Sequence, residues 1–128
     1  MAAIEVRLFL AYTGTFSEPI HDGTTLWNTV LGEAGLTEPS SSTFVKIHIQ
    51  GKPKTYAKGQ SVELKVTPEG VKKSTTRQLA QLGLFNSEGK QYVGFWLSNT
   101  GCTSLRLTAS VVGSGRSVQH LIPFKCGE

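Results

Sequence analysis

Alternation of apolar and polar residues with a period of two dominates this sequence and indicates β-strands. It runs through residues 4–10, 44–50, 62–66 and 105–111. In the second of these segments, Val45, Ile47 and Ile49 fall on one face and the polar residues between them fall on the other. A strand with this pattern has one buried face and one face in water, which is typical of antiparallel sheets.

The alternation predicts the burial of each position, because a slip of one residue would invert the whole set. We expect these apolar side chains to be buried: Val45, Ile47, Ile49, Val62, Leu64, Val66, Leu105, Leu107 and Ala109. We expect these polar side chains of the same strands to be exposed: Lys46, His48, Glu63, Lys65 and Arg106.

Turn-forming residues add further strands to this set. Polar, glycine-containing turns at 86–90 and 113–116 predict two hairpins, one between residues 84–85 and 91–93 and one between 111–112 and 117–118. The last strand is expected over residues 117–124, where Pro123 indicates a strand end or a sheet edge. Residues 76–82 fit either a strand or an irregular segment.

One segment departs from the β pattern. Leu26, Val30 and Leu31 form an apolar stripe at helical spacing, which predicts a short α-helix near residues 24–34. Asp22 or Thr24 could cap its start and Gly35 its end, with a loop following over residues 36–42.

These elements predict a single domain over residues 1–128, since a chain of 128 residues has room for one core. The predicted class is all-β, mainly antiparallel: a β-sandwich, of which the immunoglobulin-like fold is one form, with one short helix. A closed β-barrel is the alternative, because strand count alone does not show closure. No apolar stretch approaches the roughly 20 residues of a membrane-spanning helix, so no membrane is expected as a partner.

The N-terminus and the cysteines bear on location. Glu5 and Arg7 interrupt any apolar stretch of a secretory signal, so we expect a cytoplasmic protein. Cys102 and Cys126 are the two cysteines, and in that compartment the favoured interpretation is a pair of reduced core residues. A disulfide between them is the alternative and would add about 3 kcal/mol to stability.

The chain carries no signature of catalysis or metal binding. His21, His48 and His120 lie far apart in sequence without ligand spacing, so we expect neither metal nor cofactor. We interpret His48 as a solvated residue and His120 as a core residue satisfied by a hydrogen bond. A nucleophile elbow and a phosphate-binding loop are absent from the sequence, and the nine acids are scattered. We therefore expect a protein that is not an enzyme.

Charge is unevenly distributed along the chain. Residues 1–45 carry a net charge of −4, residues 46–77 carry +6 and the remainder carries +2. The central block contains a loop in which an aromatic residue stands among lysines: Lys52, Lys54, Tyr56 and Lys58. Such a loop could bind a polyanion or an acidic partner. The favoured interpretation is that these lysines keep a solvated sheet and its edges from aggregating.

The segment 92–97 is apolar on both faces, although a sandwich strand should have one wet face. Either the helix near 24–34 covers the face of Tyr92 and Trp96, with Trp27 in that contact, or that face is a binding platform. In the first case Gly94 would let the helix approach closely, and in the second it would leave a slot between the two aromatic side chains. We favour the helix cover, and Tyr92 and Trp96 remain candidate binding residues.

The function expected from the sequence is a non-enzymatic binding or interaction module whose partner is a protein or a second copy of the chain. One alternative is polyanion binding through the lysine-rich residues 46–77. Another is a small hydrolase or redox protein that uses Cys102 or His120.

Overall fold

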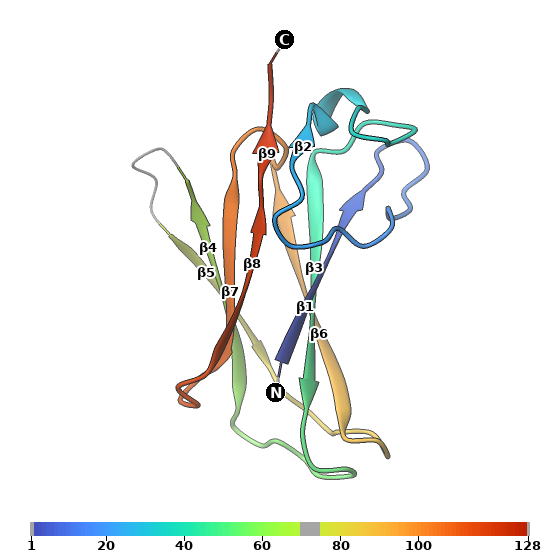
Figure 1. The fold of residues 1–128 in the computed structure, drawn as a ribbon. Helices are drawn as coiled ribbons and strands as arrows, with labels where there is room; N and C mark the ends of the chain where they lie inside the picture. The colour runs from blue at the N-terminus through green and yellow to red at the C-terminus, as the bar shows by residue number, and fades with distance from the viewer. Residues whose placement is uncertain (1, 70–74, 128) are drawn as a thin grey trace.

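The structure is a computed structural model that describes residues 2–69 and 75–127. Two antiparallel sheets pack face to face (Figure 1), one with strand order β1-β3-β6 and one with order β5-β4-β7-β8. Their strands are β1 (Ala2–Phe9), β3 (Ser42–Gln50), β4 (Ser61–Pro68), β5 (Thr76–Gln81), β6 (Lys90–Ser98), β7 (Leu105–Val111) and β8 (Ser117–Ile122). The described strands thus form the predicted β-sandwich and not a closed barrel.

The strand order is immunoglobulin-like. Counted along the chain, the first, second and fifth of these seven strands form one sheet, and the third, sixth and seventh are neighbours in the other. Both groupings are those of an immunoglobulin sandwich. The difference is the fourth strand, β5, which lies beside the third strand instead of the fifth.

The predicted register is confirmed. All nine apolar side chains expected in the core are buried, from Val45 through Ala109. Arg106 is exposed, while Lys46, His48, Glu63 and Lys65 are half-buried. The two lysines are partly covered because each pairs with a carboxylate on its own sheet face, Lys46 with Glu5 at 3.0 Å and Lys65 with Glu63 at 3.8 Å.

The predicted α-helix near 24–34 is wrong. The segment contains β2 (Leu26–Trp27) and a single 3-10 turn, η1 (Thr29–Leu31). β2 pairs in parallel with β9 (Phe124–Lys125), and Asn28 breaks the helical path with a left-handed φ of 52°. Trp27 is 50% exposed, so the expected helix cover with Trp27 in the contact is also wrong.

Residues 16–28, which we call the clasp, close one side of the sandwich. The N–H groups of Ser17 and Ile20 donate to backbone carbonyls of β1. Farther along, the Gly23 N–H donates to the Leu121 carbonyl, and the Asp22 carboxylate accepts from the Leu121 N–H at 2.6 Å. The clasp therefore ties the edge strand of one sheet to β8, the edge strand of the other.

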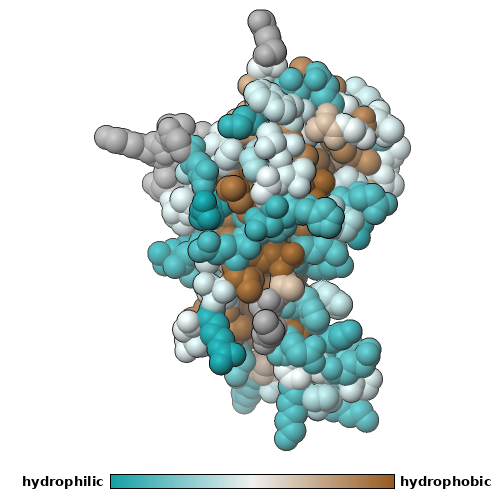
Figure 2. All heavy atoms as spheres, viewed as in Figure 1, coloured by the Kyte–Doolittle hydropathy of each residue, from teal (hydrophilic) through white to brown (hydrophobic). Residues whose placement is uncertain are grey.

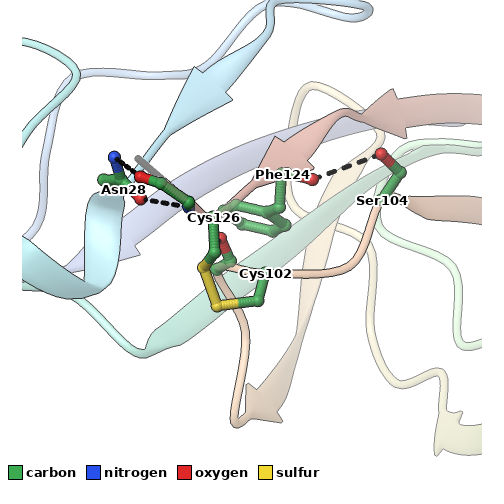
Figure 3. Close-up of a disulfide and its surroundings, with 7 residues drawn as sticks. Asn28, Cys102, Ser104, Phe124 and Cys126 are labelled. Atoms are coloured by element: carbon green, nitrogen blue, oxygen red, sulfur yellow. Dashed lines mark hydrogen bonds between the residues drawn. A yellow bond between two sulfur atoms is a disulfide. The ribbon is translucent and has the colours of Figure 1, made fainter.

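Cys102 and Cys126 form a disulfide, so the favoured interpretation of reduced core thiols is wrong. The two Cα atoms are 4.7 Å apart and both residues are exposed. The bond joins the β6–β7 loop to the segment after β9 (Figure 3). Beside it, the Asn28 side-chain amide donates to the Gly127 carbonyl and accepts from the Gly127 N–H.

The two predicted hairpins differ in outcome. The β7–β8 hairpin forms, and β8 ends at Ile122, directly before Pro123. A turn also closes from Asn86 to Gly89, but Leu84 bridges to Tyr56 instead of pairing with β6. Residues 76–81 form β5, the strand alternative for that segment.

Within the described parts of the chain, no helix has the length and hydropathy needed to cross a membrane.

Candidate functional site: a groove between the two sheets

A groove of about 890 Å³ opens between the sheets at the end of the sandwich where the β3–β4 loop and the β7–β8 hairpin lie, the lower end in Figure 1. Its size falls within the range of about 300–1,000 Å³ that is usual for ligand sites. It lies at the end opposite to β9 (Figure 1), after which the disulfide-bonded Cys126 follows.

The floor of the groove is the edge of the hydrophobic core. Inward-facing residues from β3, β7, β8 and the segment before β6 supply it: Ile49, Leu82, Phe85, Ala109, Val111 and Val118. Val111 and Val118 are only half-buried, whereas the other four are buried. Figure 2 shows hydrophobic surface between the two sheets, bordered by hydrophilic side chains. The core is therefore left partly uncovered at this end.

The charges that line the groove have one sign. Lys52, from the β3–β4 loop, and Arg116, from the β7–β8 hairpin, are its charged lining residues among those the structure describes. No described acidic side chain lines it. Hydroxyl and amide side chains complete the wall, including Thr55, Gln60 and Ser117. The arrangement suits a ligand with an apolar body and a negative charge.

The candidate residues from the sequence fall in two separate places. Lys52 and Tyr56 line the groove. Lys54 and Lys58 lie on the same loop and are exposed, but they do not line it. Tyr92 and Trp96 are on β6, on the outer face of the β1-β3-β6 sheet, which they share with Lys46 and His48. They do not line the groove.

That outer face has no open slot. The ring of Phe44 lies over Gly94, so that a Cβ added to this glycine would be 2.6 Å from Phe44 Cζ. The Trp96 ring packs edge-on against Phe9 with centroids 5.0 Å apart and is still 43% exposed. The expected slot is therefore filled by an aromatic side chain from the neighbouring strand.

A second, smaller pocket of about 470 Å³ brings together all three histidines beneath the clasp. His48 is not simply solvated: its ring stacks on Tyr92 with centroids 5.0 Å apart, and its Nε2 is buried. His120 is only 6% exposed, as expected of a core residue. Its ring has a hydrogen bond with the Ile20 backbone, but its buried Nε2 has no partner.

Burial lowers the pKa of His120, and the nearby Asp22 carboxylate opposes that shift in part. The histidine therefore stays neutral to lower pH than an exposed one. Among the described residues, no three histidine, cysteine or acidic side chains are arranged to hold a metal ion.

The structure disperses the basic block of residues 46–77. Lys46 lies on the outer face of one sheet, whereas Lys65 and Arg77 are register neighbours on the other sheet. Lys52, Lys54 and Lys58 are on the loop at the groove end. Lys72 and Lys73 lie outside the described residues. The described cations do not form one continuous polyanion-binding surface.

The alternative of a small hydrolase or redox protein would have no free thiol at Cys102. Cys102 is bonded to Cys126, so it does not offer the thiolate that nucleophilic attack requires. His120, the other residue of that alternative, is buried.

Sequence reasoning missed Arg116 and Val118 as site residues. Residues 113–116 were interpreted as a turn alone, and nothing local shows that this turn faces the β3–β4 loop. The available signal was the presence of Arg116 directly after Gly115 at a predicted hairpin tip.

The chain matches no protein-family model, no curated protein and no solved structure.

Proposed function

We propose that this protein is a non-enzymatic binding module whose partner is another protein, and that the groove between the β3–β4 loop and the β7–β8 hairpin is its ligand site. One observation carries the proposal: the core opens here into an apolar groove, and both charged residues that line it in the described part of the chain are cationic. Apolar surface of this kind gains free energy when a partner covers it.

A protein segment suits this groove better than a nucleic acid does. The floor of Ile49, Ala109 and Val111 offers nothing to a sugar–phosphate backbone, which needs cations and hydrogen-bond donors. A peptide can place apolar side chains on that floor and a carboxylate near Lys52 or Arg116. The dispersal of the other lysines favours the same conclusion.

The groove can be tested with two matched tryptophan variants on neighbouring residues. Val111 lines the groove, while Val112 is 56% exposed and does not line it. Val111→Trp should therefore fill the groove, and Val112→Trp should leave it open. A library of random linear peptides is displayed on phage and selected on the wild-type protein.

Enriched peptides should bind the wild type and Val112→Trp equally well. They should bind Val111→Trp with an affinity at least about tenfold lower. Far-ultraviolet circular dichroism and a thermal melt of each variant establish that both fold. Self-association that Val111→Trp abolishes would also support the groove, with a second copy as the partner. If no peptide is enriched, or if the peptides bind both variants equally, the proposal is wrong.

A further inference from the structure

The outer edge of β8, which does not face β7, has hydrogen-bond partners for its backbone along only part of its length. At Leu121, the N–H donates to the Asp22 carboxylate and the carbonyl accepts from the Gly23 N–H. Both backbone groups of Leu121 therefore point away from β7, toward the outer edge of the sheet. Beyond this point, the clasp continues along Pro123 and Lys125.

Backbone direction alternates along an antiparallel strand, so alternate residues present both groups to the same edge. Gln119 and Ser117 must therefore point their N–H and carbonyl groups outward as Leu121 does. Within the described parts of the chain, these backbone groups have no hydrogen-bond partner. Together they offer two donors and two acceptors in a row.

This open edge borders the groove at its Ser117 end. Ser117 and Val118 both line it, and the Val118 side chain points to the same face as the buried Ala109. Arg116 directly precedes β8, and Lys52 lines the groove from the β3–β4 loop. An extended chain beside β8 would have backbone partners on one side and an apolar floor below alternate side chains.

We propose that the partner binds as an extended strand added to the β8 edge at Ser117–Gln119, with an acidic side chain directed at Arg116 and Lys52. This inference rests on the proposed function, for which it specifies the binding mode and the charge of the ligand. In strand addition, main-chain hydrogen bonds supply affinity, and the pockets for alternate side chains supply specificity. The two cations set the sign of the charge that the partner needs.

The probes are four peptides of about six residues, the usual length of a strand, because the third is made in two forms. The first alternates valine and threonine and has an aspartate at each end. The second has lysine in place of both aspartates. The third is the first peptide with alternate backbone amides N-methylated, prepared in both phases so that one phase removes every donor that can face β8. Binding is measured by fluorescence anisotropy, and the contact is located from amide chemical shifts of the isotope-labelled protein.

The acidic peptide should bind, shift the amides of Ser117 and Gln119, and bind at least about fivefold more tightly than the lysine peptide. N-methylation in one phase should weaken it by at least about tenfold and in the other phase much less. Arg116→Glu should abolish the preference for the acidic over the lysine peptide, because Lys52 and the new carboxylate then cancel in charge.

A matched pair of variants tests the same edge from the side of the protein. Ser117→Pro removes an outward N–H that takes no part in the β7–β8 ladder, and proline is tolerated at sheet edges. Ser117→Ala keeps that N–H and should bind as the wild type does. Should Ser117→Pro fail to fold, the N-methylated peptides still decide, because they leave the protein unchanged.

The outcomes separate this inference from the proposed function. If both N-methylated peptides bind as tightly as the parent peptide and Val111→Trp abolishes the binding of all three, the groove is a ligand site but strand addition is wrong. If the acidic peptide does not bind while the phage selection yields groove-dependent peptides, the proposed function stands and this inference is overturned. If neither yields binding, both are wrong.

Discussion

At the scale of single residues, the contact between Phe44 and Gly94 explains the two-faced segment 92–97. The outer face of β6 is apolar because aromatic side chains from β1 and β3 pack across it, with Phe9 against Trp96 and Phe44 over Gly94. Phe16, from the clasp, joins this cluster at 5.5 Å from Phe44 between ring centroids. These aromatic side chains cover part of the face without a helix, while Tyr92 stays 54% and Trp96 43% exposed.

Gly94→Ala should destabilise the protein by about 1–3 kcal/mol, the usual cost of overpacking. The added Cβ would lie 2.6 Å from Phe44 Cζ, so the ring must move. Gly83→Ala is the control, since a Cβ there meets no atom within 4 Å and its backbone is not left-handed. Urea unfolding of both variants measures the difference, and equal stabilities would contradict the packing described here.

His120 should make stability depend on pH in a range where no other described group with a shifted pKa titrates. Burial lowers the pKa of His120 in the folded protein, whereas in the unfolded chain it is about 6.5. The unfolded state therefore takes up a proton first as the pH falls. Above a pH of about 6.5, this contribution to the free energy of unfolding should be fully present. It should decrease as the pH falls from about 6.5 to the folded-state pKa of His120.

This decrease should disappear in His120→Gln and persist in His21→Gln, a variant of an exposed histidine in the same pocket. Chemical denaturation at several pH values between about 7.5 and 5.5 measures it. The pKa values of Glu5 and Glu38 are lowered from 4.5, so these carboxylates titrate below that range. Parallel profiles for the wild type and His120→Gln would rule out His120 as the cause.

At the scale of elements, the strands could be predicted from the sequence and the clasp could not. Alternation is a local property, and it located β1, β3, β4 and β7 with the correct register. The apolar spacing of segment 24–34 fits a helix as well as it fits the short strand and turn that form there. What decides against the helix is pairing with residues about a hundred positions away, as in the bond from the Leu26 N–H to the Pro123 carbonyl.

The same reasoning explains which parts of the groove could be predicted. Lys52 and Tyr56 share one loop, and their clustering is visible in the sequence. Arg116 joins them only because β3 and β7 end at the same end of the sandwich, in two different sheets. A prediction from local pattern has no access to that arrangement without the strand order.

The disulfide should contribute about 3 kcal/mol, because it closes a loop between residues separated by 24 positions in sequence. Reduction, or replacement of both cysteines by serine, should lower the free energy of unfolding by this amount. The two treatments should give the same midpoint in urea, since both remove the same link. A reduced wild type as stable as the oxidised protein would contradict this expectation.

At the scale of the whole molecule, the net charge and the placement of the charges lead to different expectations of how tightly the protein binds polyanions. The chain carries a net charge of +4, which alone would suggest general affinity for polyanions. Its described cations are spread over the outer faces of both sheets, the β3–β4 loop, the β7–β8 hairpin and β9. Several of them are paired with carboxylates. Few of them can therefore contact one polyanion at the same time.

Heparin binding should accordingly be weak and shallow in its dependence on salt. A contact limited to the three lysines of the β3–β4 loop predicts a slope of log K against log salt of about −3. Replacing Lys52, Lys54 and Lys58 by glutamine should abolish retention on a heparin column. A slope of about −6 or steeper would show that the basic residues act together and would favour polyanion binding.

The positions of the first strand and of the disulfide decide how the molecule presents itself when it is anchored. Ala2 pairs with Ile49, a residue of the groove, whereas β9 and the disulfide lie at the far end (Figure 1). A tag on the C-terminal side would attach the protein to a bead or sensor chip by the end opposite to the groove, so that the groove faces the solution. A tag on the N-terminal side would stand at the mouth of the groove and compete with any partner that enters it.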